Sequence, residues 1–360
     1  MLKKAAALFL VGVSIAIWVG CGTTSSHYLY AAIPTLNQIV AFREDPISGV
    51  LTPLAGSPFA AGTDVHSIAI HPSKKFMYAA NSFDSTISLF TIDNFGALTE
   101  VTPRTATGTS PRFIVMDPAG SFLYVGNIGE NGSLWSYSID SSSGALTQVG
   151  TFQLGTIPLN MAVLPSTGAV LYVTGAGSGG SQGFIEVLGL TAGVATSFKL
   201  VTQVGGVNPD GLAIDPGGKY LYVANSAPDN SISAFAISSS DGSLTELSGS
   251  PLGETYASPV ALLVDKSDKY LYVANEGSAN VAAYSIASTG GLTLLTNSPF
   301  GTSSQPAFIA TDPSGTHLFV GNQISGATIE SFSLDSGNGT LTEVQTYSVG
   351  NAPTSIAVTP

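Results

Sequence analysis

The sequence predicts an all-β fold, a seven-bladed β-propeller of four-stranded blades, and three observations lead to that prediction. A motif of the type Tyr-Leu-Tyr-Val-Ala-Asn recurs seven times along the 360 residues, at spacings of 46 to 50 residues, which is the length of a propeller blade. Each repeat contains four short strand-like segments separated by turns. The chain also starts and stops with incomplete repeats that complement each other.

The seven copies of the motif are centred on aromatic residues, namely Tyr30, Tyr78, Tyr124, Tyr172, Tyr222, Tyr272 and Phe319. In a representative repeat the four strand segments cover residues 211–216, 220–225, 232–237 and 242–247. The turn Asp215-Pro216-Gly217-Gly218 places proline where φ must be preset and glycine where φ must be permissive. No window shows a convincing helical period, so strands account for the whole repeat.

The two ends of the propeller segment predict how the ring closes. Residues 28–32 match the second strand of a repeat, and residues 355–360 match the first strand. Open sheet edges are a liability, so the two segments are expected to share one blade. The sequence therefore predicts a seventh blade whose innermost strand is C-terminal and pairs with the N-terminal strands.

The first twenty residues are not part of this repeat. Lys3 and Lys4 precede the apolar run Ala5 to Val19, and Gly20 precedes Cys21, the single cysteine of the chain. The pattern is typical of a secretory signal and resembles the processing site of bacterial lipoproteins. We expect a signal at residues 1–20, a linker at 21–26 after lipidated Cys21, and a propeller at 27–360. The protein would then lie in the cell envelope, lipid-anchored or, if Cys21 is a chance cysteine, secreted.

Charge and composition exclude several classes of partner. Without Lys3 and Lys4 the chain has 9 basic and 23 acidic residues, a net charge of −14, which repels phosphate backbones and argues against nucleic acid. The Gly-rich segment 175–181 has no lysine and no helical pattern behind it, so it is interpreted as an inter-strand loop rather than a phosphate cradle. We expect a monomer without a cofactor, held to the membrane only by its lipid.

In a propeller, the loops that lead into the first strands surround one mouth of the central channel. The residues just before the first strands are His66, Arg112, Leu159, Asp210, Val260, Ala307 and Thr354. The next positions hold Ser67, Phe113, Asn160, Gly211, Ala261, Phe308 and Ser355. Second strands that end in Asn, one of them in Asn275-Glu276, reach the same face. This mouth is the face that mixes a histidine, an arginine and carboxylates.

These residue types suit ester hydrolysis. His66 is a candidate general base, Arg112 a candidate clamp for an anion or oxyanion, and Asp210 or Glu276 a candidate orienting group. Ligand contacts are expected from Phe113, Asn160, Phe308, Asn81 and Asn225. Asn81 and Asn225 are copies of an Asn that ends five of the seven second strands, and this recurrence also fits a purely architectural role. The other histidines, His27, His71 and His317, point to the opposite face, and no set of metal ligands emerges.

The repeated Tyr-Val-Ala-Asn, the Asp-Pro-x-Gly turns and the Gly-x-Leu-Thr fourth strands resemble the YVTN and lactonase family of seven-bladed propellers, which includes 6-phosphogluconolactonases. The resemblance covers about residues 27–360. It implies that Val65-His66-Ser67 corresponds to the Pro-His-Ser of active members. Ser110-Pro111-Arg112-Phe113 keeps the family arginine but has Phe113 in place of histidine, and Asn275-Glu276 matches the Asn-Glu ending in a different blade.

Two functions from different classes remain open on the sequence. The first is a lactonase-like hydrolase acting on a neutral or weakly anionic lactone at the channel mouth. The second is a non-enzymatic envelope scaffold that binds a glycan, a peptide or a protein there. A phosphorylated lactone is disfavoured because its phosphate needs cationic clamps, and Arg112 is the one strong cation at this mouth.

Overall fold

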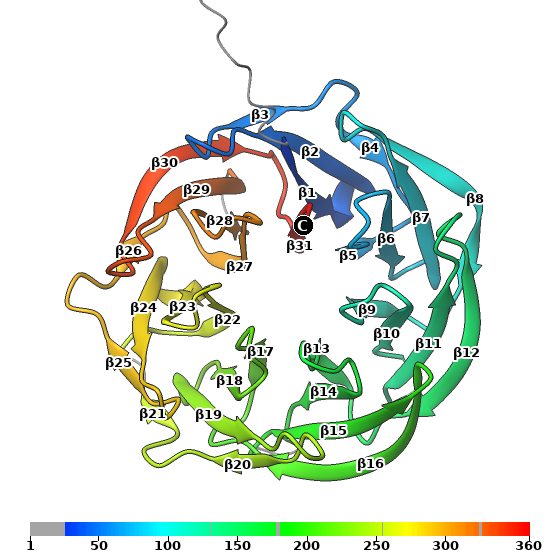
Figure 1. The fold of residues 1–360 in the computed structure, drawn as a ribbon. Helices are drawn as coiled ribbons and strands as arrows, with labels where there is room; N and C mark the ends of the chain where they lie inside the picture. Colours follow the sequence, from blue (N-terminus) through cyan, green and yellow to red (C-terminus); the bar gives the residue numbers. More distant parts are fainter. Residues whose placement is uncertain (1–25, 130, 178–180, 254, 324–325) are drawn as a thin grey trace, which may run out of the picture.

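The computed structural model describes residues 26–360 except 130, 178–180, 254 and 324–325, and within strand β16 it describes the backbone but not the side chains of residues 197–201. Seven antiparallel sheets are arranged around a common axis, which confirms the predicted seven-bladed propeller (Figure 1). The predicted signal at 1–20 and Cys21 lie outside the described residues. No helix in the described part of the chain is long and apolar enough to cross a membrane.

Each blade has its first strand nearest the axis and its later strands progressively further out. The innermost strands are β5 (Val65–Ile70), β9 (Pro111–Met116), β13 (Pro158–Val163), β17 (Pro209–Ile214), β22 (Pro259–Val264), β27 (Pro306–Thr311) and β31 (Ser355–Val358). The second strands are β6 (Phe76–Asn81), β10 (Phe122–Asn127), β14 (Val170–Gly175), β18 (Tyr220–Asn225), β23 (Tyr270–Asn275), β28 (His317–Asn322) and β1 (His27–Ile33).

The third strands are β7 (Thr86–Ile92), β11 (Ser133–Ile139), β15 (Phe184–Thr191), β19 (Ser231–Ile237), β24 (Asn280–Ile286), β29 (Thr328–Leu334) and β2 (Gln38–Glu44). The outer strands are β8 (Leu98–Ala106), β12 (Leu146–Gln153), β16 (Val194–Gln203), β20 (Leu244–Glu246) with β21 (Leu252–Gly253), β25 (Leu292–Leu294) with β26 (Phe300–Gly301), β30 (Leu341–Ser348), and β3 (Leu51–Pro53) with β4 (Phe59–Ala60). The described residues also form two short 3-10 helices, η1 (Pro34–Leu36) and η2 (Glu276–Ser278). The Gly-rich segment predicted as a loop begins at Gly175, the last residue of β14, and its residues 178–180 lie outside the described part of the chain.

The ring closes as the sequence predicted. The C-terminal strand β31 pairs antiparallel with β1 from Leu29↔Val358 to Ala32↔Ser355. Beyond the strand end, the Tyr28 amide donates to Thr359 Oγ1 over 3.0 Å, and the Thr359 amide donates back to the Tyr28 carbonyl over 2.9 Å. We call the blade formed by β31, β1, β2, β3 and β4 the closing blade. The N-terminal and C-terminal strands of the propeller are thus joined by the hydrogen bonds of one sheet.

The central tyrosine of the repeat motif explains how neighbouring blades are joined. Tyr78 is completely buried, and its hydroxyl donates over 2.8 Å to the Gly144 carbonyl, in the turn between the third and fourth strands of the next blade. Tyr30, Tyr172, Tyr222 and Tyr272 make the equivalent bond to a glycine carbonyl over 2.7 to 3.0 Å. A buried hydroxyl needs such a partner, so the Tyr and Gly of the repeat form a matched pair across each of these blade interfaces.

Candidate active site

A cavity of about 350 Å³ opens at one end of the ring axis, where the innermost strands begin. All seven residues that the repeat alignment places before the first strands line this cavity. Six of the seven next positions line it as well, and the exception is Gly211, which has no side chain. The volume is within the range of small-molecule sites. The repeat alignment therefore predicted which positions surround this cavity.

A β-bulge at the start of six innermost strands explains why two successive residues face the cavity. Val65 pairs with Asn81 and Ser67 with Ala80, which leaves His66 without a partner on β6. Arg112, Leu159, Asp210, Val260 and Ala307 are skipped in the same way in their blades. A flat strand would send alternate side chains to opposite faces. The bulge redirects the skipped residue into the mouth.

His66 and Arg112 form a pair across the boundary between two adjacent blades. Arg112 Nη1 lies 3.1 Å from His66 Nε2, and a guanidinium can only donate, so Nε2 is the acceptor. Burial and the positive charge of Arg112 lower the pKa of His66 to about 4. The imidazole is therefore neutral near pH 7 and carries its proton on Nδ1. In this geometry the basic nitrogen of His66 is occupied in holding Arg112.

Two carboxylates belong to the opposite side of the mouth. Asp210 begins β17 and Glu276 follows β23, whereas His66 and Arg112 belong to β5 and β9 across the ring (Figure 1). Burial raises the pKa of Asp210, and a hydrogen bond of 2.5 Å from Ser226 Oγ to Asp210 Oδ2 partly offsets that effect. The cavity is therefore polarised, with a cation on one wall and carboxylates on the other.

The predicted ligand contacts fall into two groups. Phe113, Asn160 and Phe308 line the cavity, and Asn160 Nδ2 donates over 3.0 Å to the backbone carbonyl of Asp210, which ties β13 to β17. Asn81 and Asn225 do not line it. Both are completely buried between the second and third strands, where Asn81 bonds Thr86 and Ser88 and Asn225 bonds Ser231 and Ser233. For these two the architectural interpretation is the one that the structure favours.

Two polar residues at the site were not predicted from the sequence. Gln323 lines the cavity, and Ser226 bonds Asp210. Each immediately follows the repeated Asn of a second strand, which is also the position of Glu276. Comparing that position across all repeats would have identified both.

Comparison with known proteins assigns the family. A model described as lactonase, 7-bladed beta-propeller, matches residues 52–163, 170–258 and 253–358. A 6-phosphogluconolactonase from Blochmanniella pennsylvanica is 27% identical over 192 residues, which are 51% of this chain and 56% of that protein. One from Serratia proteamaculans is 28% identical over 109 residues, 30% of this chain and 31% of that protein. The matches therefore span between about a third and just over half of these relatives' lengths.

Solved structures share the fold at lower sequence identity. A putative 6-phosphogluconolactonase from Bacteroides uniformis has a TM-score of 0.79 at 18% identity, covering 93% of this chain and 99% of its own. The periplasmic gluconolactonase of Pseudomonas aeruginosa has a TM-score of 0.76 at 17% identity, with the same coverage of both chains. The fold, the repeat and the family model agree: this chain belongs to the lactonase family of seven-bladed β-propellers.

Proposed function

We propose that this protein hydrolyses a small lactone that is neutral or weakly anionic, in the cavity at the mouth of the propeller. The observation that carries the proposal is the polarised cavity, which is lined by Arg112 and, two blades away, by Asp210, a partly buried carboxyl group whose pKa is raised by burial. Ester hydrolysis needs a donor for the developing oxyanion and a base for water, and these two groups can supply them from different walls of the cavity.

The geometry favours a division of roles that differs from the sequence prediction for His66. Arg112 receives the lactone carbonyl oxygen. Asp210 takes a proton from water as the water oxygen attacks the carbonyl carbon, and it returns that proton to the ring oxygen when the C–O bond breaks. The product is a hydroxy acid. Because its Nε2 accepts from Arg112, His66 acts here as a positioning residue for the guanidinium rather than as the base.

The substrate class follows from the charges of the mouth. Among the described residues lining the cavity, Arg112 is the one lysine or arginine, and Asp210 and Glu276 are negative. A phosphate would need more than one cationic partner to balance its charge of nearly −2. The chain shares its fold with a protein described as a periplasmic gluconolactonase, a name that indicates an unphosphorylated substrate. This similarity supports an unphosphorylated sugar lactone, or a related lactone, as the substrate of this protein.

A lactone panel tests this proposal. We expect turnover of unphosphorylated aldonolactones, and a much lower kcat/KM for 6-phosphogluconolactone. Asp210→Asn should lower kcat about a hundredfold or more, since general-base catalysis contributes factors of that order. His66→Gln keeps an acceptor for Arg112 and should retain most activity, whereas His66→Ala should not. An unchanged rate in Asp210→Asn would refute its role as the base.

The pH profile adds a signature that a structural role would not produce. The base must be ionised, so kcat/KM should fall on acidification, with a midpoint above the usual aspartate pKa of about 4. Ser226→Ala removes the hydrogen bond that lowers the pKa of Asp210, so its acid limb should move to higher pH. If the wild type hydrolyses nothing in the panel, the envelope scaffold becomes the better explanation of the cavity.

We propose further that the protein works in the cell envelope, attached through lipidated Cys21. The support is the sequence pattern of Lys3 and Lys4, an apolar run and the single cysteine. Cells given a fatty-acid analogue should label the wild type, and Cys21→Ser should not be labelled. Equal labelling of both proteins would contradict the lipid anchor. Release of the unlabelled variant into the medium would identify a secreted form.

A further inference from the structure

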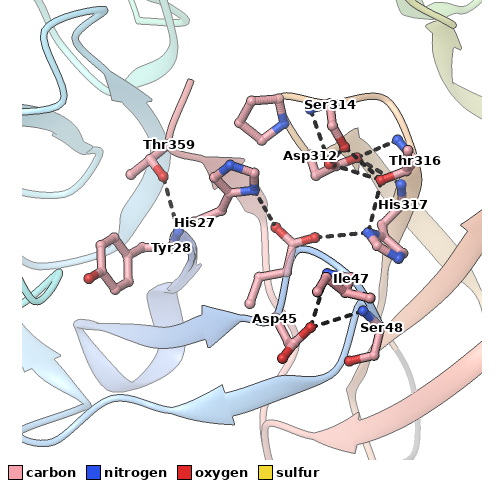
Figure 2. A network of polar contacts seen from close by, with 12 residues as sticks. His27, Tyr28, Asp45, Ile47, Ser48, Asp312, Ser314, Thr316, His317 and Thr359 are labelled. Carbon is pink, nitrogen blue, oxygen red and sulfur yellow. Dashed lines mark hydrogen bonds and ion pairs between the residues drawn. The ribbon is translucent and has the colours of Figure 1, made fainter. Parts of the chain in front are cut away.

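A second group of chemically reactive side chains lies at the face opposite the mouth, between the closing blade and the β27–β30 blade. We call His27, Glu44, Asp312 and His317 the closure cluster. His27 and Glu44 are directly opposite each other at the ends of β1 and β2, and Asp312 and His317 flank the β27–β28 hairpin. Figure 2 shows His27 and His317 on either side of a carboxylate, that of Glu44. The sequence predicted no metal-ligand set, because these residues come from three distant segments.

Burying the two carboxylates of this cluster costs free energy unless a positive charge compensates them. Glu44 and Asp312 have no exposed surface, His317 is 3% exposed, and His27 is 8% exposed. Glu44 Oε1 is buried and accepts no well-formed hydrogen bond, although His317 Nδ1 lies 3.2 Å away. Buried carboxylates are ordinarily paired or bound to metal. A divalent cation with two neutral imidazoles would neutralise both carboxylates of the cluster.

The spacing of the cluster suits a small cation. Ligand atoms of His27, Glu44 and Asp312 all lie within 4.8 Å of one another. Glu44 Oε2 is 3.3 Å from His27 Nδ1, and the other oxygen, Oε1, is 3.2 Å from His317 Nδ1. These distances are long for a charge-assisted hydrogen bond, which is usually 2.7–2.9 Å. The distance between Glu44 Oε2 and His27 Nδ1 is close to the edge of a tetrahedron with metal–ligand bonds of 2.0–2.1 Å, which is about 3.4 Å. His317 contacts the opposite oxygen and does not belong to the three groups that approach one another this closely.

The surrounding chain holds the ligands in place. Asp312 Oδ1 accepts the backbone N–H groups of Thr316 and His317 over 2.8 and 2.7 Å, which fixes the hairpin that carries the imidazole. Gly49 packs against the His317 ring so closely that an added Cβ would lie 2.4 Å from its Cδ2. These contacts fix the imidazole that lies beside Glu44, and outer groups of this kind orient the side chains that bind a metal.

We propose that the closure cluster binds a divalent transition-metal ion of the zinc type, with His27, Glu44 and Asp312 as ligands and His317 as the imidazole that orients Glu44. An imidazole and two carboxylate oxygens are ligands that zinc accepts. The ion connects β1 and β2 of the closing blade to the β27–β28 hairpin of the neighbouring blade. It therefore acts as a structural clamp and is independent of the mouth cavity.

Zinc alone is the probe that tests this site. The full-length chain, without a histidine tag and with Cys21→Ser in every sample to exclude a thiolate ligand, is stripped with chelator and dialysed against Zn²⁺. We expect one zinc per chain by elemental analysis and a higher melting temperature than the stripped protein. Binding should weaken as pH falls below the usual histidine pKa of about 6.5, because ligating imidazoles must be neutral.

Single substitutions in the cluster show whether the zinc sits there. His27→Gln and Asp312→Asn should each lose the bound zinc and the gain in melting temperature. His71→Gln is the matched control, since His71 is a histidine of the same face that bonds the Gly120 carbonyl outside the cluster, and it should keep both. Cobalt bound to the wild-type protein should give the intense visible absorption of a tetrahedral site. This measurement does not depend on whether a substituted protein folds. Absence of stoichiometric zinc in the wild type, or zinc retained by both cluster variants, would overturn the proposal.

Discussion

Replacing Arg112 with alanine is expected to lower kcat/KM for lactone hydrolysis by a factor of about a hundred or more. In the proposed mechanism the guanidinium is the donor that meets the developing oxyanion, and loss of one such donor typically costs a factor of 10² to 10³ in rate. Arg112→Lys keeps the charge but loses the planar fork, so it should fall between the wild type and alanine. Steady-state kinetics on the best lactone of the panel measures the effect.

The fold should survive this substitution, because Arg112 is the bulged residue of β9 and lines the cavity rather than a blade core. Val260→Ala, an apolar change in the same ring of the mouth, is the matched control and should cost only a few-fold. Removing the positive charge should also raise the pKa of His66 from about 4, which NMR titration of the imidazole follows. A fully active Arg112→Ala protein would exclude this mouth as the catalytic site.

Deleting residues 354–360 is expected to cause the largest loss of stability. The deletion removes β31, exposes the edge of β1, and leaves the apolar side chains that pack against Ile356 and Val358 without partners. Losing those two partly buried side chains and a strand ladder should cost on the order of 5 kcal/mol. Thermal unfolding and size-exclusion chromatography should show a much lower melting temperature and aggregation through the open edge.

Deleting only Pro360 is the control for this truncation. Pro360 is exposed and lies beyond the last paired residue, so its loss should leave the melting temperature unchanged. An unchanged melting temperature after removal of residues 354–360 would contradict the view that β31 closes the ring.

Most of the fold was predictable because the repeat carries its information locally. Turn residues such as Asp215-Pro216-Gly217-Gly218 and the alternation along each strand set the order of strands within a blade. Counting seven first strands and seven second strands then required Ser355–Val358 to complete the blade begun by His27–Ile33. The same alignment placed His66, Arg112, Asp210 and Glu276 around one mouth, because equivalent positions of a repeat occupy equivalent places in the ring.

Only the tertiary structure shows which of these residues contact one another and which way their side chains are directed. The bulge at the start of six innermost strands is one example, because it is seen only in how each strand pairs with its neighbour. A proline stands directly before the skipped residue in five of these strands, but it does not by itself fix the shift in register. The bond from Arg112 to His66 joins different blades, so its geometry depends on how the blades pack rather than on spacing along the chain. This bond occupies the basic nitrogen of His66, and for that reason we propose Asp210 rather than His66 as the base.

The closure cluster illustrates the same division more strongly. His27 and His317 are 290 positions apart in the chain, and neither belongs to a recognisable metal motif. They meet across Glu44 only because the ends of the chain are brought together in one ring. The sequence by itself determined the number of blades, their order, the closing strand and the residues of the mouth, all of which are set by local pattern and repetition. The contacts between blades were decided by the closed ring, since closure places side chains together that no local rule relates.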